Sequence, residues 1–188
     1  MRRLFYAFAG VFLIMTAGCS GGSNGSKEPT AKIGDPAPAF SVEATDGSTV
    51  RLEDFKGKPL VLTFMAEWCP CSNKSAPVFK EAYAEYHPRG VEFMIFGFQD
   101  SRSKFSDFVK RQAIPFPAAY DSGDAVGASF GVLAPPTTFF ITPDGKVQRA
   151  FYGKIEERDK LFGWIDELVA RKATPPEEKK GKKEEKKK

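Results

Sequence analysis

The sequence contains very little histidine and cysteine. Its 188 residues include one histidine, His87, and three cysteines, Cys19, Cys69 and Cys71. His87 falls at the end of an expected helix and far along the chain from Cys69 and Cys71. We therefore expect an exposed or hydrogen-bonded histidine and not a catalytic one. Three cysteines would leave one thiol over in an exported protein, unless one of them serves another purpose.

A basic face is also missing from the central part of the chain. The net charge of +4 is concentrated in Arg2, Arg3 and the segment 174–188, which holds seven Lys and four Glu. The residues between them carry a net charge of −1. Domains that bind nucleic acid present a clustered basic surface. We therefore expect no nucleic-acid partner.

The apolar run at the N-terminus, residues 4–17, is too short for a membrane-spanning helix and has the length found in signal peptides. Residues 15–19, Met-Thr-Ala-Gly-Cys, resemble a bacterial lipobox, although Thr16 stands where Leu is usual. In a lipobox, small residues precede a Cys that is lipidated and becomes the new N-terminus. We expect a lipid anchor on Cys19, which would leave two thiols. Ordinary secretory cleavage with a free Cys19 stays open.

The composition divides the chain into four parts. Residues 1–18 form the expected signal peptide, and residues 19–32, rich in Gly and Ser, a flexible tether. A thioredoxin-like domain is expected over residues 33–172, for reasons given below. Residues 173–188 are rich in Lys, Glu and Pro and are expected to be disordered. Together these parts predict an exported, membrane-anchored lipoprotein on the periplasmic face of a bacterial envelope.

The sequence Glu-Trp-Cys-Pro-Cys-Ser at residues 67–72 is the main candidate site. It follows a buried-strand pattern at 60–65 and precedes a helical pattern. Cys69 is predicted to be the helix N-cap, with Pro70 at the first helical position, where no N–H is needed. There the first-turn amides and the helix dipole would favour a thiolate, so we expect Cys69 to react before Cys71. The alternative is a buried Cys69 that acts as a small apolar side chain.

Elsewhere the chain alternates between strand-like and helix-like patterns. The predicted strands are short apolar or alternating runs, at residues 40–44, 49–52, 60–65, 91–98, 116–120, 137–141 and 147–151. The predicted helices are amphipathic, at residues 71–86, after a cap at Ser103, at 124–130 and at 156–172. A strand–helix–strand unit followed by a hairpin and a terminal helix indicates an α/β protein with a thioredoxin-type order of elements.

Several motifs carry a family resemblance over residues 33–172. They are the turn-rich segment 34–40, the hairpin and loop at 46–59, Phe-Met-Ala-Glu-Trp-Cys at 64–69, and Pro-Thr at 136–137. In these the chain resembles membrane-tethered thioredoxin-like proteins of the TlpA type, within the redoxin (AhpC/TSA) group. The resemblance implies a thioredoxin-like fold with a central mixed β-sheet flanked by helices. It also implies an N-terminal β-hairpin and an extra helix and strand at 103–120.

The resemblance implies roles for individual residues as well. Cys69 takes the place of the nucleophile. Pro136 and Thr137 take the place of a cis-proline loop that faces the cysteines and binds the substrate backbone. Trp68 and Pro70 flank the sulfur and would shape the docking surface. Neither a cofactor nor a metal is expected.

The chain departs from the family pattern at the residues that are expected to carry out the reaction. The family has Trp-Cys-x-x-Cys, whereas Ser72 holds the resolving position here and the second thiol is Cys71. Two positions where relatives have a buried acid hold Thr63 and Ser75. Glu67 is a nearby acid, which is expected to be solvated.

Thiol–disulfide exchange is the leading functional hypothesis. The Cys69 thiolate would attack a disulfide to give a mixed disulfide, and Cys71 would resolve it. A Cys69–Cys71 disulfide is expected to form but to be strained, because the Cβ vectors of the two residues diverge. The resemblance implies exported protein thiols and disulfides as substrates, with a redox partner protein.

Three other hypotheses stay open. Two thiolates could capture a soft metal such as Cu(I), although copper carriers of this fold usually add a histidine and His87 is poorly placed. A thiol peroxidase is disfavoured because Ala66 stands three residues before Cys69, where a hydroxyl is usual. A catalytically inactive interaction lipoprotein is the third possibility.

Overall fold

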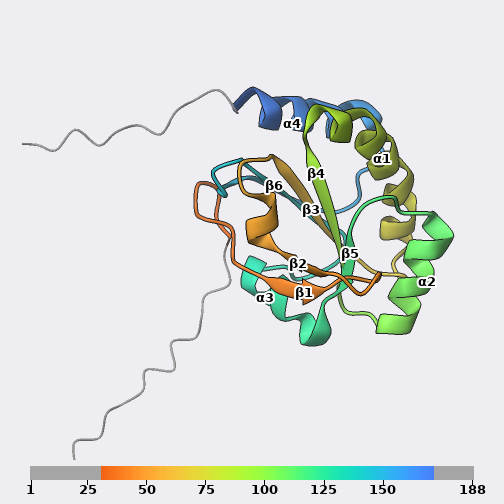
Figure 1. Ribbon diagram of the computed structural model, residues 1–188. Helices are drawn as coiled ribbons and strands as arrows, with labels where there is room; N and C mark the ends of the chain where they lie inside the picture. Colours follow the sequence, from red (N-terminus) through yellow and green to blue (C-terminus); the bar gives the residue numbers. More distant parts are fainter. Residues whose placement is uncertain (1–30, 172–188) are drawn as a thin grey trace, which may run out of the picture.

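A mixed five-stranded sheet forms the centre of the molecule, with the strand order β5-β4-β3-β6-β7 (Figure 1). The computed structural model describes residues 31–171, so the predicted signal peptide, Cys19, most of the tether and the C-terminal tail lie outside it. The strands are β3 (Leu60–Met65), β4 (Glu92–Gly97), β5 (Ala118–Tyr120), β6 (Thr137–Ile141) and β7 (Val147–Tyr152). β3, β4 and β5 are parallel, and β6 and β7 continue the sheet antiparallel. The predicted α/β class is confirmed.

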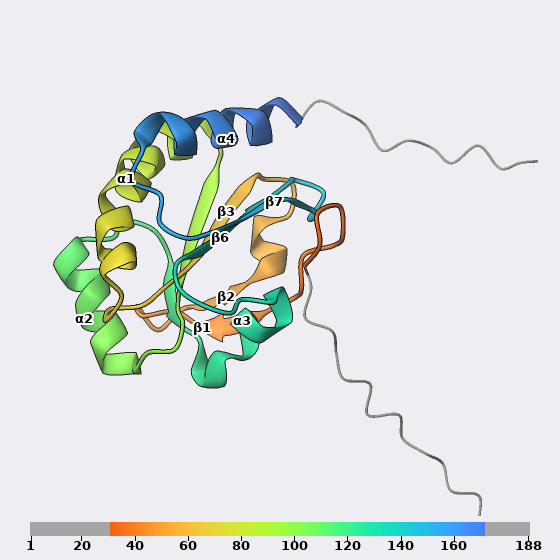
Figure 2. The ribbon, with the colours of Figure 1, turned by 180° about the vertical axis from the view of Figure 1, so that it is seen from behind.

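The sheet separates two apolar cores, because successive side chains of a strand point to opposite faces. α1 (Pro70–Tyr86), α2 (Arg102–Gln112) and α4 (Arg158–Ala170) cover one face (Figure 1, Figure 2). A hairpin of β1 (Ser41–Glu43) and β2 (Thr49–Arg51), with α3 (Ala125–Phe130), covers the other. Val61, Ile95 and Phe140 belong to the first core, and Leu62, Phe96 and Phe139 to the second. Both β3 and β6 are buried along their whole length, as expected of central strands covered on both faces.

The segment between β4 and β5 contains the predicted extra helix, α2. Its cap is Ser101 and not Ser103 as the sequence suggested, because Ser101 has extended backbone angles and its Oγ accepts the amide of Lys104 at 3.3 Å. Ser103 lies inside the first turn. The helix therefore begins two residues earlier than predicted, at Arg102.

Strand register brings three distant loops to one edge of the sheet. Met65 pairs with Gly97 at the carboxyl ends of the parallel strands β3 and β4. Phe64 pairs with Thr137, the first residue of the antiparallel strand β6. The loops after β3, after β4 and before β6 consequently meet, and Cys69 lies among them.

The described helices are all short relative to a bilayer. Within residues 31–171, none combines the length and the apolar composition that crossing a membrane requires.

Candidate active site

Cys69 lies at the start of α1, as the sequence predicted. It is the N-cap, with extended backbone angles, and Pro70 is the first helical residue. The Cys69 amide donates to the carbonyl oxygen of Ala66 at 3.2 Å, which ties the loop back to the end of β3. The residue is buried, with 7% of its surface exposed. The sequence thus placed the thiol correctly at the strand–helix junction.

The Cys69 thiol faces the loop before β6. Its Sγ lies 3.5 Å from the carbonyl oxygen of Pro135, to which the S–H donates. The Pro135–Pro136 peptide bond is cis, as the family resemblance implies for this loop. Thr137 holds this loop by donating from its hydroxyl to the carbonyl of Ala134 at 2.8 Å.

The expectation that first-turn amides would reach the sulfur was wrong for this state of the protein. The N-cap side chain accepts no hydrogen bond from the helix. The physical reason is that a protonated thiol is a donor and only a weak acceptor, so it turns to a free carbonyl. The Pro135 carbonyl supplies that partner.

Cys71 and Ser72 occupy different environments in the first turn of α1. Both described cysteines are free thiols, and Cys71 is half-buried. Ser72 is fully buried, and its hydroxyl accepts the amide of Ala66 at 3.1 Å.

Trp68 presents an exposed aromatic surface beside Cys69. Trp68 is 54% exposed, and its indole N–H donates to the carbonyl oxygen of Gln99 at 2.7 Å. Gln99 has a φ of 52°, a left-handed conformation that is uncommon outside glycine. The carboxylate of Asp124 holds it there by accepting the Gln99 amide at 2.7 Å. The indole is thus fixed to the loop after β4 while about half of the residue stays exposed.

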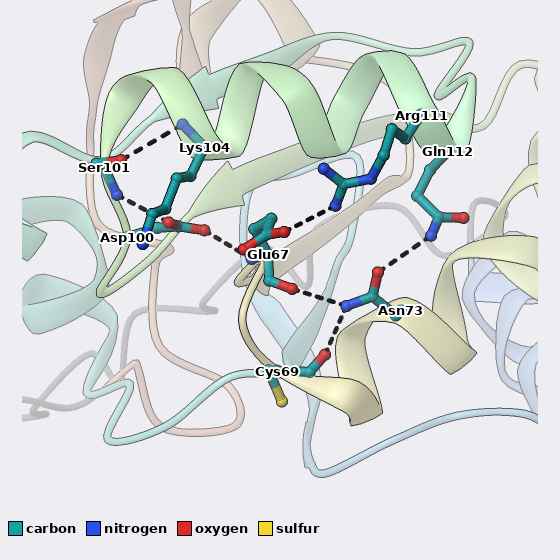
Figure 3. A network of polar contacts seen from close by, with 8 residues as sticks. All are labelled: Glu67, Cys69, Asn73, Asp100, Ser101, Lys104, Arg111 and Gln112. Atoms are coloured by element: carbon teal, nitrogen blue, oxygen red, sulfur yellow. Dashed lines mark hydrogen bonds and ion pairs between the residues drawn. The ribbon is translucent and has the colours of Figure 1, made fainter.

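The sequence suggested that Glu67 is solvated, but in the structure its side chain and its backbone amide both have protein partners. Its carboxylate forms an ion pair with Arg111 of α2 at 2.9 Å, and its amide donates to Asp100 at 2.6 Å (Figure 3). Asn73 of α1 contacts the same loop and is held by Gln112 of α2. None of these four partners was identified from the sequence. They lie up to 44 positions from their contacts, and no local pattern signals such pairs.

The polar residues at the positions of the family's buried acids have structural partners. Thr63 Oγ1 lies 3.1 Å from the hydroxyl of Thr138 across the β3–β6 pair. The hydroxyl of Ser75 accepts the amide of Ile155 at 2.9 Å. Each thus joins α1 or β3 to a neighbouring segment.

His87 is far from the thiols along α1. It stacks on Tyr83, with ring centroids 4.5 Å apart, and its Nδ1 lies 3.5 Å from the carboxylate of Glu92. It sits at the C-terminal end of the helix that Cys69 begins, as the sequence suggested. Within residues 31–171, no three His, Cys, Asp or Glu side chains gather in a way that could hold a metal ion.

The comparisons with known proteins agree with this geometry. Residues 33–150 match the AhpC/TSA family. The thiol-disulfide oxidoreductase ResA of Bacillus cereus is 34% identical over 144 residues, which cover 77% of this chain and 83% of the relative.

Solved structures show the same fold. A structure described as a thioredoxin from Neisseria meningitidis is 27% identical, with a TM-score of 0.65 over 71% of this chain and 89% of that one. A thiol:disulfide interchange protein DsbE from Chlorobium tepidum is 25% identical, with a TM-score of 0.66 over 75% of this chain and 97% of that one. The predicted thioredoxin-like fold is confirmed.

Proposed function

Because this chain belongs to the AhpC/TSA family and is a thiol-disulfide oxidoreductase with a thioredoxin fold, we propose that Cys69 is its attacking thiol and Cys71 its partner thiol. The observation that carries the proposal is the position of the Cys69 sulfur, 3.5 Å from the Pro135 carbonyl and beside the cis bond to Pro136. A disulfide that reaches Cys69 lies against this loop and the exposed ring of Trp68. Pro70 borders the sulfur on the helix side.

The reaction is a two-step exchange. The Cys69 thiolate attacks one sulfur of a protein disulfide, a mixed disulfide forms, and the other substrate sulfur leaves as a thiolate. The Cys71 thiolate then attacks Cys69 Sγ, which releases the second substrate sulfur. The substrate gains two electrons and two protons, and the protein keeps a Cys69–Cys71 disulfide. In the oxidising direction the same steps run backwards.

The substrates that fit this site are thiols and disulfides of exported proteins, and a second redox protein returns the pair to its starting state. The N-terminal lipobox supports a lipid anchor on Cys19 and a place on the periplasmic face of the envelope. Pro136 and Thr137 bind the substrate backbone, and Trp68 and Pro70 shape the surface on which it docks.

Reduction of insulin disulfides by the full chain with dithiothreitol tests the proposal. The wild-type protein should accelerate precipitation of the insulin B chain, and Cys69→Ser should abolish the acceleration. Cys71→Ser should slow turnover and accumulate the mixed disulfide, which intact-mass analysis detects. An unchanged rate in Cys69→Ser would sink the assignment. Peroxide consumption and competition with bathocuproine for Cu(I), run on the same variants, identify a peroxidase or a copper carrier instead.

A further inference from the structure

The side chain of Asn73 contacts both sides of the loop that presents Cys69. Its amide nitrogen Nδ2 donates to the carbonyl of Glu67 at 2.8 Å and to the carbonyl of Cys69 at 3.0 Å (Figure 3). The backbone amide of Asn73 donates to the same Cys69 carbonyl at 3.2 Å. Both N–H donors of the side chain are therefore used on this loop.

The remaining polar atom of Asn73 reaches α2. Its Oδ1 accepts from Nε2 of Gln112 at 3.2 Å. Rotating the amide by half a turn would place its oxygen against two carbonyl oxygens and its nitrogen against the Gln112 nitrogen. All three contacts would become repulsive, so the network itself fixes the orientation of the side chain.

These contacts fix the peptide planes before Trp68 and after Cys69, at the two ends of this dipeptide. The Glu67 carbonyl sets the plane before Trp68, and the Cys69 carbonyl sets the plane after Cys69. The two planes restrain the stretch of backbone that carries the indole and the thiol. Arg111, next to Gln112 on α2, holds the Glu67 side chain at 2.9 Å. Helix α2 and Asn73 thus hold the loop from outside the site.

We propose that Asn73, supported by Gln112 of α2, is a positioning residue that orients the Cys69 sulfur for attack on a disulfide. The inference deepens the proposed exchange chemistry and rests on it in naming Cys69 as the attacking thiol. Orientation matters because attack requires close, in-line approach of the two sulfurs, and a misplacement of about 1 Å can cost 10²-fold in rate. Asn73 itself touches no reacting atom.

The test measures the reaction of Cys69 with the small disulfide 5,5′-dithiobis(2-nitrobenzoate) as a function of pH. Every protein is the full chain carrying Cys71→Ser, and modification is quantified by mass on the peptide that contains Cys69. The pH series runs from below to above the usual thiol pKa of about 8.5. It separates the plateau rate of the thiolate from the pH midpoint at which the thiolate forms.

Asn73→Ala should lower the plateau rate about tenfold and leave the midpoint in place, because orientation is lost and the charge environment is not. Gln112→Ala should lower the plateau rate by a smaller factor. In a protein that already carries Asn73→Ala, Gln112→Ala should have no further effect on the plateau rate, since Gln112 acts only through Asn73. Asn73→Asp keeps the size of the side chain and removes both donors, so it should also lower the plateau. It serves if Asn73→Ala does not fold.

Ser101→Ala is the matched control. It removes the cap of the same helix α2 at its other end, so it weakens the helix without touching Asn73. The plateau rate of Ser101→Ala should equal that of the reference protein, which carries Cys71→Ser alone, while its thermal unfolding temperature should be lower. A plateau that is unchanged or raised in Asn73→Ala overturns the inference, as does a Gln112→Ala effect of equal size in both backgrounds. A midpoint that moves to that of an exposed cysteine would mean general loosening, which also overturns it.

Insulin reduction by the wild-type chain, with both Cys69 and Cys71 present, distinguishes the two proposals. A protein with no exchange activity, but with the expected pattern of plateau rates, refutes the proposed function and leaves the positioning role of Asn73 standing. If the wild-type protein reduces insulin but Asn73→Ala leaves the plateau rate unchanged, the proposed function stands and the positioning role of Asn73 is refuted.

Discussion

At the scale of single residues, the unusual feature is that the second thiol is Cys71, while the next position, where the family has its second cysteine, holds Ser72. Ser72 is fully buried and accepts the Ala66 amide, whereas Cys71 is half-buried. A pair of cysteines two positions apart around Pro70 must bring diverging Cβ atoms together to form a disulfide. The energy of that strain favours the reduced pair.

The first prediction follows from this strain. The double substitution Cys71→Pro with Ser72→Cys rebuilds a C-x-x-C site and should lower the reduction potential. The protein as it stands should be the stronger oxidant, and each 1.4 kcal/mol of relieved strain corresponds to about 30 mV. A glutathione redox titration of both forms gives the two potentials. Equal reduction potentials in the two forms would show that the disulfide is not strained. If no intramolecular disulfide forms at any ratio of reduced to oxidised glutathione, Cys69 works alone.

Asp121 is a second residue with a testable property. It is buried just before the short turn that leads into α3, and its two oxygens accept the amides of Val126 and Gly127 at 2.9 and 2.7 Å. Burial raises the pKa of this carboxyl, although the two amide hydrogen bonds oppose the rise. Because the folded pKa exceeds the unfolded one, its stabilising contribution is complete at low pH and falls as the pH rises through the folded pKa.

We therefore expect the unfolding free energy of the wild type minus that of Asp121→Asn to fall as the pH rises from the acid side. Urea unfolding of both proteins across a pH series measures it, and titration of all other groups cancels in the difference. A difference that does not change with pH, or that grows with pH, contradicts the prediction.

At the scale of elements, helix α2 packs closely on β4. Gly97 ends β4, and a Cβ placed on it would lie 2.3 Å from Cγ of Phe105, which is fully buried. Real side-chain atoms do not approach so closely. The absence of a side chain at Gly97 is therefore what lets α2 lie near enough for Arg111 to reach Glu67 and for Gln112 to reach Asn73.

Gly97→Ala should destabilise the protein by about 1–3 kcal/mol, because the added methyl group must push the Phe105 ring and α2 outwards. Urea unfolding measures the loss. Gly163→Ala is the matched control, since Gly163 lies within α4 and a Cβ there would meet no atom within 4 Å. It should be neutral or stabilising by up to about 1 kcal/mol. Equal effects at the two glycines would contradict the close packing of α2.

At the scale of the whole molecule, the lipobox predicts that the mature protein begins at lipidated Cys19, which lies outside the described residues. Intact-mass analysis of membrane fractions should show the added diacylglyceryl group. Cys19→Ser should release the protein from the membrane or leave it unprocessed. An unmodified protein that stays out of the membrane fraction in the wild type would refute the anchor.

The sequence by itself determined the order of the elements and the place of the thiol. The apolar run of β3, the Pro at the first helical position and the caps around α1 are local signals, because each depends on neighbours within one or two turns. For this reason Cys69 was placed at the N-cap of α1, and β6 was predicted over residues 137–141 as observed. The misplacement of the α2 cap, from Ser101 to Ser103, is a local error between two similar residues.

Only the tertiary structure decided which atoms contact the thiol and the residues that hold its loop. The Pro135 carbonyl that faces Cys69 is 66 positions away, and Gln112, which supports Asn73, is 39 positions away. The partner of the Cys69 sulfur also depends on its protonation, since a thiol donates where a thiolate accepts. Strand register brings these segments to one edge of the sheet. Register and helix packing are set by the sum of many distant contacts, so no local pattern in the chain encodes them.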